Sequence, residues 1–396
     1  MRHTLLIFVG LLLTQPVYAA SLRTALDQAW EKNPQAQTLE AKRAESNAQG
    51  VAANSLLAGA PAVILGHRND QLSNNAGVRE WEVGIALPLW LPGQRDARQR
   101  QAQIGRAGLE ANILALRLRL AGELREAMWQ VRQVEAQIRL DEARALTAKK
   151  LAEDVAKRVQ AGELAKTDLN LAQNEWRTAQ AAVLQSRNRL LQAQQAYATL
   201  TGTTVLPDDM TEGAQSKPLS DDHPLMEEAR LAIEVAQAQV RVTNQSRRDN
   251  PELELSTRRA RGNLNDAYAG TVALALRLPL ATDARNLPLT SAAQTALTRV
   301  QSEYTRVRLT LEYQLQQAVQ ALQAADQLLD LARQQRAAAW ENLDLIQKSF
   351  SLGESDLFTL LRARTAAFEA EQVHNQQEIA QALSRARLNQ AQGALP

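Results

Sequence analysis

Two glycines interrupt long helical patterns in this chain, and each is followed closely by acidic residues. Glycine just past the end of one helix, with an Asp or Ser at the start of the next, is what a tight helix–turn–helix requires. Carboxylates that gather in a narrow passage have another use, because they attract cations and repel anions. The two segments contain the candidate site residues Gly162, Glu163, Leu164, Asp168, Gly353, Glu354, Ser355, Asp356 and Leu357.

The caps of the helices that follow can be predicted from the same segments. We expect Thr167 or Asp168 to cap the helix after the first glycine, and Ser355 or Asp356 to cap the helix after the second. Asp168 lies six residues after its glycine, whereas Asp356 lies three residues after its own. The two segments therefore do not match residue for residue, and capping alone is the simpler interpretation of either acid.

Metal and cofactor chemistry find little support in the sequence. The chain has no cysteine, and none of its histidines has a partner at metal-ligand spacing. The four histidines are His3, His67, His223 and His374. Glu252 and Glu254 share one face of a strand-like segment and could line a passage, although a solvated face is the simpler interpretation. We predict no specific metal site and no cofactor.

Catalysis and nucleic-acid binding are not expected either. The sequence contains no nucleophile elbow, no phosphate-binding glycine loop and no plausible His/acid/nucleophile constellation. The net charge is +2, and Arg and Glu are interspersed rather than gathered into a basic face. The chain is therefore predicted to be neither an enzyme nor a nucleic-acid-binding protein.

The N-terminus has the composition of a secretory signal. Residues 1–3 supply a basic end, residues 5–13 form an apolar run, and Ala19 offers a small residue for cleavage. The apolar run is too short to span a bilayer. We expect residues 1–19 to be a signal peptide that is removed on export.

The rest of the chain repeats one order of landmarks about 190 residues apart. Helical tracts open at Pro34 and Pro224, Leu-Pro-Leu closes strand-like tracts at 87–89 and 278–280, and glycine breaks long helices at 162 and 353. A unit of this size is not a solenoid repeat. We predict two helix–strand–strand–helix modules, residues 20–201 and 223–396, joined by a linker at 202–222.

Each module contains a long tract with a coiled-coil pattern. Leu124, Val131 and Ile138 lie seven residues apart, and a longer seam of the same spacing runs from Tyr304 to Ile346. A seven-residue apolar repeat makes helices supercoil around one another. We therefore predict long helical hairpins at about 93–201 and 285–396, with the two glycines at their tips.

Strand pairs are predicted at about 61–90 and 251–280, where apolar residues alternate with small or polar ones. Their lengths suit a membrane barrel. The apolar residues of the helices lie on the heptad seams, where they pack against other helices. Few apolar residues are therefore left on the helices to cover a sheet in a soluble protein. A membrane barrel is therefore favoured over a sheet packed on helices. The residues expected to face lipid are Trp81, Val83, Ile85, Leu87, Val272, Leu274, Leu276 and Leu278.

Four strands cannot close a membrane barrel, because the smallest have about eight. Open strand edges in lipid would leave backbone groups without hydrogen bonds. Two copies would give eight strands around an interior filled by side chains, and three would give twelve strands around a lumen. If the strands enter a membrane, the chain must oligomerise.

This order of features resembles the TolC-like outer membrane factors over essentially the whole mature chain. The features are the signal, Asn33-Pro34, strands ending in Leu87-Pro88-Leu89, a coiled hairpin and Gly162-Glu163-Leu164, and then the same order again. Within that family the chain looks most like the cobalt–zinc–cadmium (CzcC-like) branch. The passages that suggest the branch are Gly93-Gln94-Arg95, Asp283-Ala284-Arg285-Asn286 and Gly353-Glu354-Ser355-Asp356-Leu357.

The resemblance implies a homotrimer with a twelve-stranded barrel in the bacterial outer membrane and a large periplasmic helical tunnel. It implies two protein partners, a periplasmic adaptor (membrane fusion protein) and an inner membrane RND-type pump, and outer membrane lipid around the barrel. The chain would be a passive gated exit duct, and the branch suggests heavy-metal cations as cargo. The hairpin tips would dock the adaptor and form the mouth, where each tip acid would occur three times around the axis.

Other functions stay open at this point. The same type of channel could export drugs or other small molecules. A periplasmic coiled-coil adaptor would also be exported and rich in heptads, but it should carry one hairpin flanked by compact β-rich domains, without a second strand pair. An exported enzyme on a coiled-coil scaffold has no sequence feature in its favour.

Overall fold

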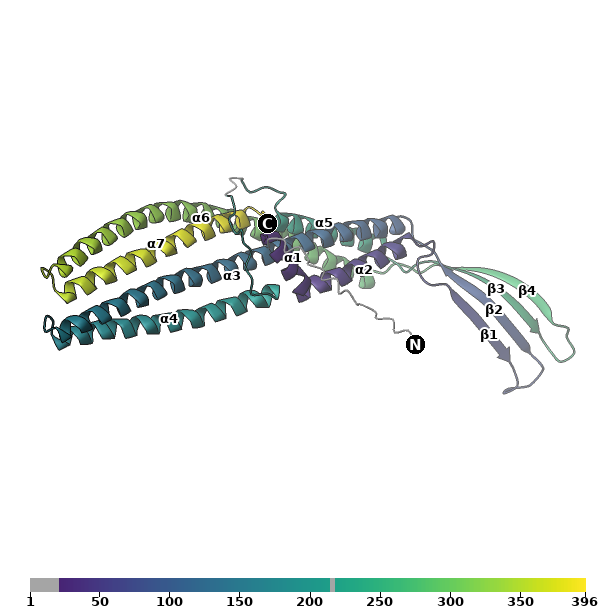
Figure 1. Ribbon diagram of the computed structural model, residues 1–396. Helices are drawn as coiled ribbons and strands as arrows, with labels where there is room; N and C mark the ends of the chain where they lie inside the picture. Colours follow the sequence, from purple (N-terminus) through teal and green to yellow (C-terminus); the bar gives the residue numbers. More distant parts are fainter. Residues whose placement is uncertain (1–20, 214–217) are drawn as a thin grey trace, which may run out of the picture. The chain divides into compact units, whose positions relative to one another are not determined.

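The computed structural model describes residues 21–213 and 218–396, so the predicted signal at 1–19 lies outside the described residues. Within that part the chain forms seven helices and four strands (Figure 1). The helices are α1 (Leu22–Lys32), α2 (Pro34–Asn54), α3 (Gln94–Gln160), α4 (Lys166–Thr201), α5 (Pro224–Gln245), α6 (Asp283–Ser351) and α7 (Leu357–Ala391). The strands are β1 (Ala62–Asn69), β2 (Arg79–Pro88), β3 (Glu252–Arg261) and β4 (Ala269–Arg277). The predicted fold class, mainly helical with two pairs of strands, is confirmed.

None of the helices in the described part is both long and apolar enough to cross a bilayer.

The chain divides into two compact units, which we call the helical unit and the sheet unit. The helical unit comprises the described residues of 1–33, 117–216 and 316–396. The sheet unit comprises those of 34–116 and 217–315. The helices α3 and α6 each begin in the sheet unit and end in the helical unit.

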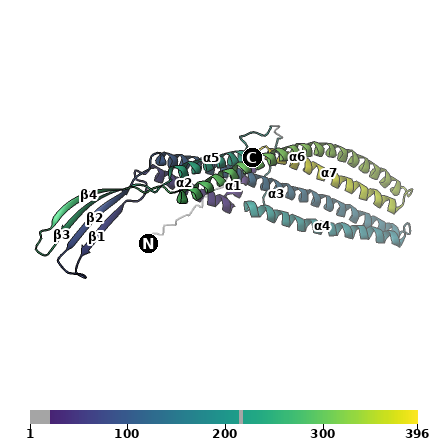
Figure 2. The same cartoon turned by 180° about the vertical axis from the view of Figure 1, so that it is seen from behind.

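The long helices of the helical unit run alongside one another in both views (Figure 1 and Figure 2). The heptad residues Leu124 and Val131 of α3 are buried, and so are Ala318, Ala325 and Ala332 of α6. Heptad spacing keeps one seam turned toward the neighbouring helix, and small alanines let the two axes approach closely. The packing of this unit therefore follows the seven-residue pattern seen in the sequence.

The sheet unit carries one antiparallel sheet in the order β1-β2-β3-β4. Its register aligns apolar side chains in rows; Ile85, for example, lies between Val63 and Leu255. Many of these side chains are exposed, Val83 by 50% and Val272 by 76%. We call the side that carries them the apolar face, with Val63, Leu65, Trp81, Val83, Ile85, Leu87, Leu253, Leu255, Val272, Leu274 and Leu276.

Leu278 was predicted to continue this face, but β4 ends at Arg277. Pro279 follows, and proline has no amide hydrogen to donate to a strand partner. The alternation of side chains therefore extends beyond the last paired residue of the strand.

The opposite side of the sheet, which we call the polar face, carries all four glutamates of the strands. They are Glu80, Glu82, Glu252 and Glu254. The Ser256 hydroxyl donates to Oε1 of Glu82 (3.1 Å), and Arg258 Nε pairs with Oε1 of Glu80 (2.9 Å). The residue opposite Ser256 is Gly84, where an added Cβ would come within 2.9 Å of the serine Cβ. This face is thus polar, and it carries small residues where Gly84 of β2 lies opposite Ser256 of β3.

Buried polar groups fix the junction between the strands and the helices of the sheet unit. The Gln94 side chain is only 4% exposed. Its Oε1 accepts hydrogen bonds from the amide of Leu91 (3.1 Å) and from Asn250 Nδ2 (2.6 Å), and its Nε2 donates to Ser246 (3.1 Å). Asn250 also donates to the carbonyl of Leu89 (2.8 Å). The start of α3 is thereby tied to the segment that leads into β3.

Candidate functional site at the hairpin tips

The first hairpin tip closes with a Schellman motif. After α3 ends at Gln160, Gly162 adopts the left-handed conformation with φ of +81°. The amide of Glu163 donates to the carbonyl of Arg158 (2.9 Å), and the amide of Gly162 donates to the carbonyl of Val159 (3.1 Å). These two bonds satisfy carbonyls that the end of a helix otherwise leaves free.

The second tip has the same geometry. After α6, Gly353 has φ of +80°. The amide of Glu354 donates to the carbonyl of Ser349 (3.0 Å), and the amide of Gly353 donates to the carbonyl of Phe350 (3.2 Å). A side chain with a Cβ is strained in this conformation, which explains glycine at both positions. The two tips thus form the same turn from different sequences.

The helices that leave the tips are bonded to aspartates in two different ways. Asp356 is the N-cap of α7, and its Oδ1 accepts a hydrogen bond from the amide of Thr359 (2.7 Å). The N-cap of α4 is Ala165, and Asp168 in the first turn accepts from the Ala165 amide (3.1 Å). The predicted cap at Asp356 is confirmed. The predicted cap at Thr167 or Asp168 is wrong, because the Asp168 carboxylate reaches back and lets the helix begin earlier.

One apolar cluster holds both tips in place, and we call it the tip core. It contains residues of four helices, so the two hairpins meet there; its members are Leu151, Ala152, Val155, Ala172, Leu343, Phe350, Leu357, Leu360, Ala363 and Ala367. Leu357 is 2% exposed, and Leu164 of the other tip packs against the cluster. Burial of a leucine side chain contributes about 1.5–3 kcal/mol. The leucine that follows each tip acid therefore anchors its turn.

The acidic side chains of the tips face solvent rather than the tip core. Glu163, Glu354 and Asp356 are exposed. In the described part of the chain, no side-chain hydrogen bond or ion pair holds either glutamate. Hydrogen bonds from the side chain and amide of Thr359 hold the pKa of Asp356 below its ordinary value. Asp356 is thus charged at neutral pH, and the two glutamates are available to an ion or a partner.

Two arginines connect the hairpins beside the tip core. Arg364 of α7 donates from Nη1 to the carbonyl of Thr147 on α3 (3.2 Å). Burial lowers the pKa of Arg364, whose guanidinium has no carboxylate partner among the described residues. Arg158 of α3 lies over the ring of Phe350 on α6, 5.1 Å from its centroid. These contacts connect the α3–α4 hairpin to the α6–α7 hairpin.

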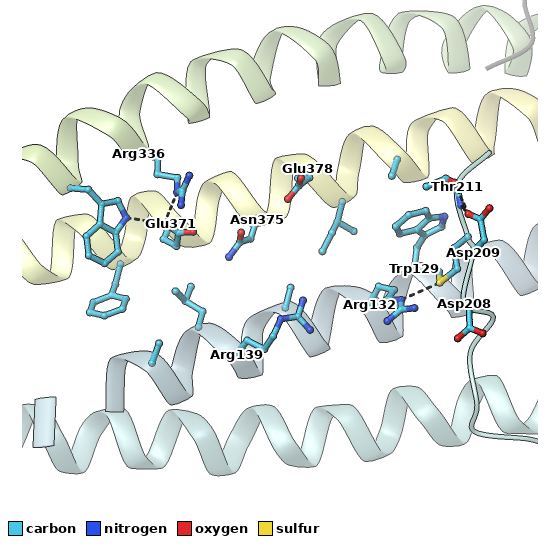
Figure 3. Close-up of a pocket in the computed structure, with 18 of the residues that line it drawn as sticks. Trp129, Arg132, Arg139, Asp208, Asp209, Thr211, Arg336, Glu371, Asn375 and Glu378 are labelled. Carbon is cyan, nitrogen blue, oxygen red and sulfur yellow. Dashed lines mark hydrogen bonds and ion pairs between the residues drawn. The ribbon is translucent and has the colours of Figure 1, made fainter. Parts of the chain in front are cut away.

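A cavity of about 780 Å³ lies between α3, α6 and α7 (Figure 3). Arg132 and Arg139 of α3 lie across it from Asn375 and Glu378 of α7, as Figure 3 shows. Other charged and aromatic lining residues are Trp129, Asp208, Asp209, Arg336, Trp340, Phe368 and Glu371. The cavity therefore lies partway along α3 and α7. The tip core lies at one end of this helix pair, and the ends of α3 and α7 that are far from the tips in this unit lie at the other.

At those opposite ends, a buried ion pair attaches the linker to the helices. Arg125 of α3 is 2% exposed and binds both carboxylate oxygens of Glu212, at 2.8 and 2.6 Å. It also donates to Gln390 Oε1 (2.6 Å) and to the carbonyl of Ala394 (3.1 Å). Asn389 donates to Oε2 of the same glutamate (3.2 Å). We call this group of five residues the linker clasp.

The structure thus gathers only some of the predicted site residues. Leu164 and Leu357 contact the same core, while no described hydrogen bond or ion pair joins an acid of one tip to an acid of the other. The sequence did not point to Arg158 or Arg364. Arginine is too frequent in this chain for either to stand out, and only the paired helices show which of them lies between two hairpins.

Comparison with known proteins supports one family. Residues 219–394 match the family described as outer membrane efflux protein. No curated protein matches the chain. The match covers the second of the two predicted modules and includes the second hairpin tip.

Solved structures match over nearly the whole chain. The crystal structures of CusC, which concern folding and transmembrane channel formation, have 16% identity and a TM-score of 0.77 and cover 94% of this chain and 92% of that one. The outer membrane protein VceC of Vibrio cholerae has 17% identity and a TM-score of 0.73, with 95% and 96% covered. The open state of the MtrE outer membrane channel of Neisseria gonorrhoeae has 19% identity and a TM-score of 0.73, with 94% and 89% covered.

These relatives are channels and outer membrane proteins rather than enzymes. The chain therefore has the fold of the TolC-like outer membrane channels, and its residues 219–394 are similar to the outer membrane efflux protein family.

Proposed function

We propose that this protein is the outer membrane channel of an efflux system. It acts as a passive gated exit duct together with a periplasmic adaptor and an inner membrane RND-type pump. The observation that carries the proposal is the sheet, whose apolar face is exposed. In the described part of the chain, the outer edges of strands β1 and β4 pair with no further strand. Such a sheet suits lipid only if its edges are paired.

Three copies meet this requirement better than two. Edge-to-edge pairing of β4 with β1 of the next copy would give twelve strands in a homotrimer. Eight strands would leave an interior just wide enough for side chains. The polar face supports the larger ring, because its four glutamates per chain need water, which a lumen supplies.

The gate is proposed to lie at the hairpin tips. The two hairpins are joined by the tip core and by the linker clasp, and the cavity lies between these two contact zones. Opening the mouth would require the tip contacts to part while the linker clasp stays closed. The candidates are Glu163, Asp168, Glu354 and Asp356 as the charged rim, with the two tip turns as the docking surface for the adaptor.

The two-module organisation is part of the proposal. Residues 20–201 and 223–396 would be two copies of one unit, with 202–222 as the linker. The shared Schellman turns at Gly162 and Gly353 support it. In a trimer, six similar hairpins would then surround one axis.

We propose heavy-metal cations as cargo, as in the CzcC-like branch that the sequence resembles. The carboxylates on the polar face and at the tips favour cations over anions along such a passage. Drug or other small-molecule export by the same channel is the alternative. A strain that lacks the protein should lose tolerance to zinc, cobalt, cadmium or copper. Loss of tolerance to drugs alone would favour the alternative.

Conductance in planar bilayers tests the channel and the gate together. The purified protein should insert as a trimer and conduct, whereas a periplasmic adaptor would not. Asp356→Ser keeps a side chain that can cap α7 but removes its charge, and Glu354→Gln removes the neighbouring charge. Both changes together should raise the open probability and reduce the preference for cations. Unchanged conductance and selectivity would leave Asp356 as a cap alone.

A further inference from the structure

The apolar face of the sheet ends in a cluster of arginines on the side of the turns. In register, the row beyond Leu65 and Val83 contains His67, Trp81 and Arg259. The next row contains Asn69, Arg79 and Arg261. The face therefore changes from apolar rows to an aromatic and then a basic row within a few residues of the turns at 70–78 and 262–268. We call Arg79, Arg259 and Arg261 the arginine cluster.

No acid balances these charges on their own face. Side chains alternate along a strand, and all four strand glutamates lie on the polar face, where Arg258 pairs with Glu80. The turns contribute Asp70 and Asp266, and neither forms an ion pair with the arginine cluster in the described residues. One Asp70 oxygen instead accepts the amide of Gly77 (3.0 Å). The cluster thus carries three positive charges, and none of them forms an ion pair with a described residue.

The fold brings these like charges together instead of separating them. Arg79 and Arg261 are direct partners across the β2–β3 ladder, an arrangement that destabilises a sheet when the charges are alike. The guanidinium carbons of Arg259 and Arg261 lie 5.4 and 5.2 Å from the centroid of the Tyr268 ring. Two of the three guanidinium groups therefore lie against the same tyrosine ring. A bound anion would remove the repulsion that the register imposes.

We propose that the arginine cluster binds the phosphate groups of lipid headgroups at the turn end of the sheet. The guanidinium fork matches phosphate oxygens in pairs. The acyl chains of the same lipid would lie on the rows of the apolar face that follow directly below, around Leu65, Val83 and Val272. Aromatic residues such as Trp81 and Tyr268 suit the level between chains and headgroups. This inference rests on the proposed function, which places the apolar face in lipid.

Lipid binding by the purified full-length protein in neutral detergent tests the proposal. The probes are lipid A with two phosphate groups, the same lipid without them, and inorganic phosphate. Replacing the cluster by Arg79→Gln, Arg259→Gln and Arg261→Gln should weaken binding of the phosphorylated lipid about fivefold for each arginine, on the order of 100-fold in all. The lipid without phosphates should bind wild type and variant alike, and equimolar inorganic phosphate should not displace the phosphorylated lipid.

The polar face offers a matched control of equal charge. Arg68→Gln, Arg258→Gln and Arg277→Gln remove three arginines from strands of the same sheet, and they break ion pairs with Glu80 (2.9 Å) and Glu252 (3.5 Å). Lipid binding should nevertheless change by less than about twofold. Equal weakening in both triple variants would overturn the proposal in favour of a general charge effect. Displacement by equimolar inorganic phosphate would overturn it in favour of a free-anion site.

Channel conductance in bilayers of neutral lipid separates this inference from the proposed function. Both triple variants should conduct, which also reports that they are folded. Normal conductance together with equal lipid binding by wild type and the arginine-cluster variant would refute the lipid site and leave the channel intact. Absence of conductance in the wild-type protein would refute the proposed function itself.

Discussion

The linker clasp should stabilise the attachment of the linker to α3 by several kcal/mol. Arg125 is buried and makes four hydrogen bonds, two of them to Glu212. Arg125→Met would fill much of the same volume but leave a largely buried carboxylate with Asn389 as its remaining partner. Removing one partner of a buried ion pair costs about 3–5 kcal/mol. The attachment of the linker to α3 should therefore open on the order of 100- to 4000-fold more often.

Limited proteolysis of the purified protein measures this opening. Cleavage within residues 202–213 should accelerate in proportion to the open population when reclosing is fast. Arg387→Met is the matched control, because Arg387 pairs with Glu126 across the same two helices but both side chains are about half exposed, at 57% and 49%. Loss of an exposed pair costs about 0–1 kcal/mol, so cleavage should change by less than about fivefold.

A second substitution distinguishes the ion pair from simple packing. Arg125→Met with Glu212→Gln removes both charges, so the double variant should be protected better than the sum of the two single changes predicts. Two outcomes would refute the reasoning. One is equal cleavage of Arg125→Met and Arg387→Met, and the other is strict additivity of the two clasp substitutions.

Three further changes probe the turns. Gly162→Ala and Gly353→Ala should each cost about 1–2 kcal/mol because both glycines are left-handed, which faster amide hydrogen exchange at the tips would report. The Asp356 cap should stabilise α7 fully above the pKa of a free aspartate, about 4, and should lose this effect as pH falls through the lowered pKa of the folded state. Amide exchange in the first turn of α7, measured against pH, reports the effect, and Asp356→Ser should abolish its pH dependence. Gly77→Ala should separate the two strand turns, since its Cβ would clash with the amide nitrogen of Leu264; proteolysis at 70–78 should then accelerate.

Patterns with a short period were the part of the fold that the sequence could predict. The heptads at Leu124 and Val131 and the alternation through Val83 and Ile85 each report which face of an element is apolar, and the structure places the helices and strands accordingly. The glycine breaks were equally informative, because a left-handed residue at a helix end leaves few alternatives to Gly. The limit of such patterns is visible at Leu278, where apolar alternation continues but pairing stops.

Pairings between residues far apart in the chain could not be predicted from the sequence. With 45 basic and 43 acidic residues, nothing marks Arg125 and Glu212 as partners or Arg364 as the arginine between two hairpins. The arginine cluster illustrates the same limit. Arg79 and Arg261 are unremarkable in the chain, and their opposition exists only once the register of β2 against β3 is known.

The caps of α4 and α7 change how the tip acids should be compared between the two modules. In sequence, Asp168 and Asp356 lie at different distances from their glycines, which argued against equivalent acidic tips. In the structure, Asp356 binds the amide of the third helical residue from the N-cap position, and Asp168 binds the N-cap amide from the third position. These are the two halves of one reciprocal capping arrangement. Each tip thus keeps one aspartate at its helix start and one glutamate in its turn. A gate built from both tips can therefore present the same acidic residues at each tip, although the two sequences differ.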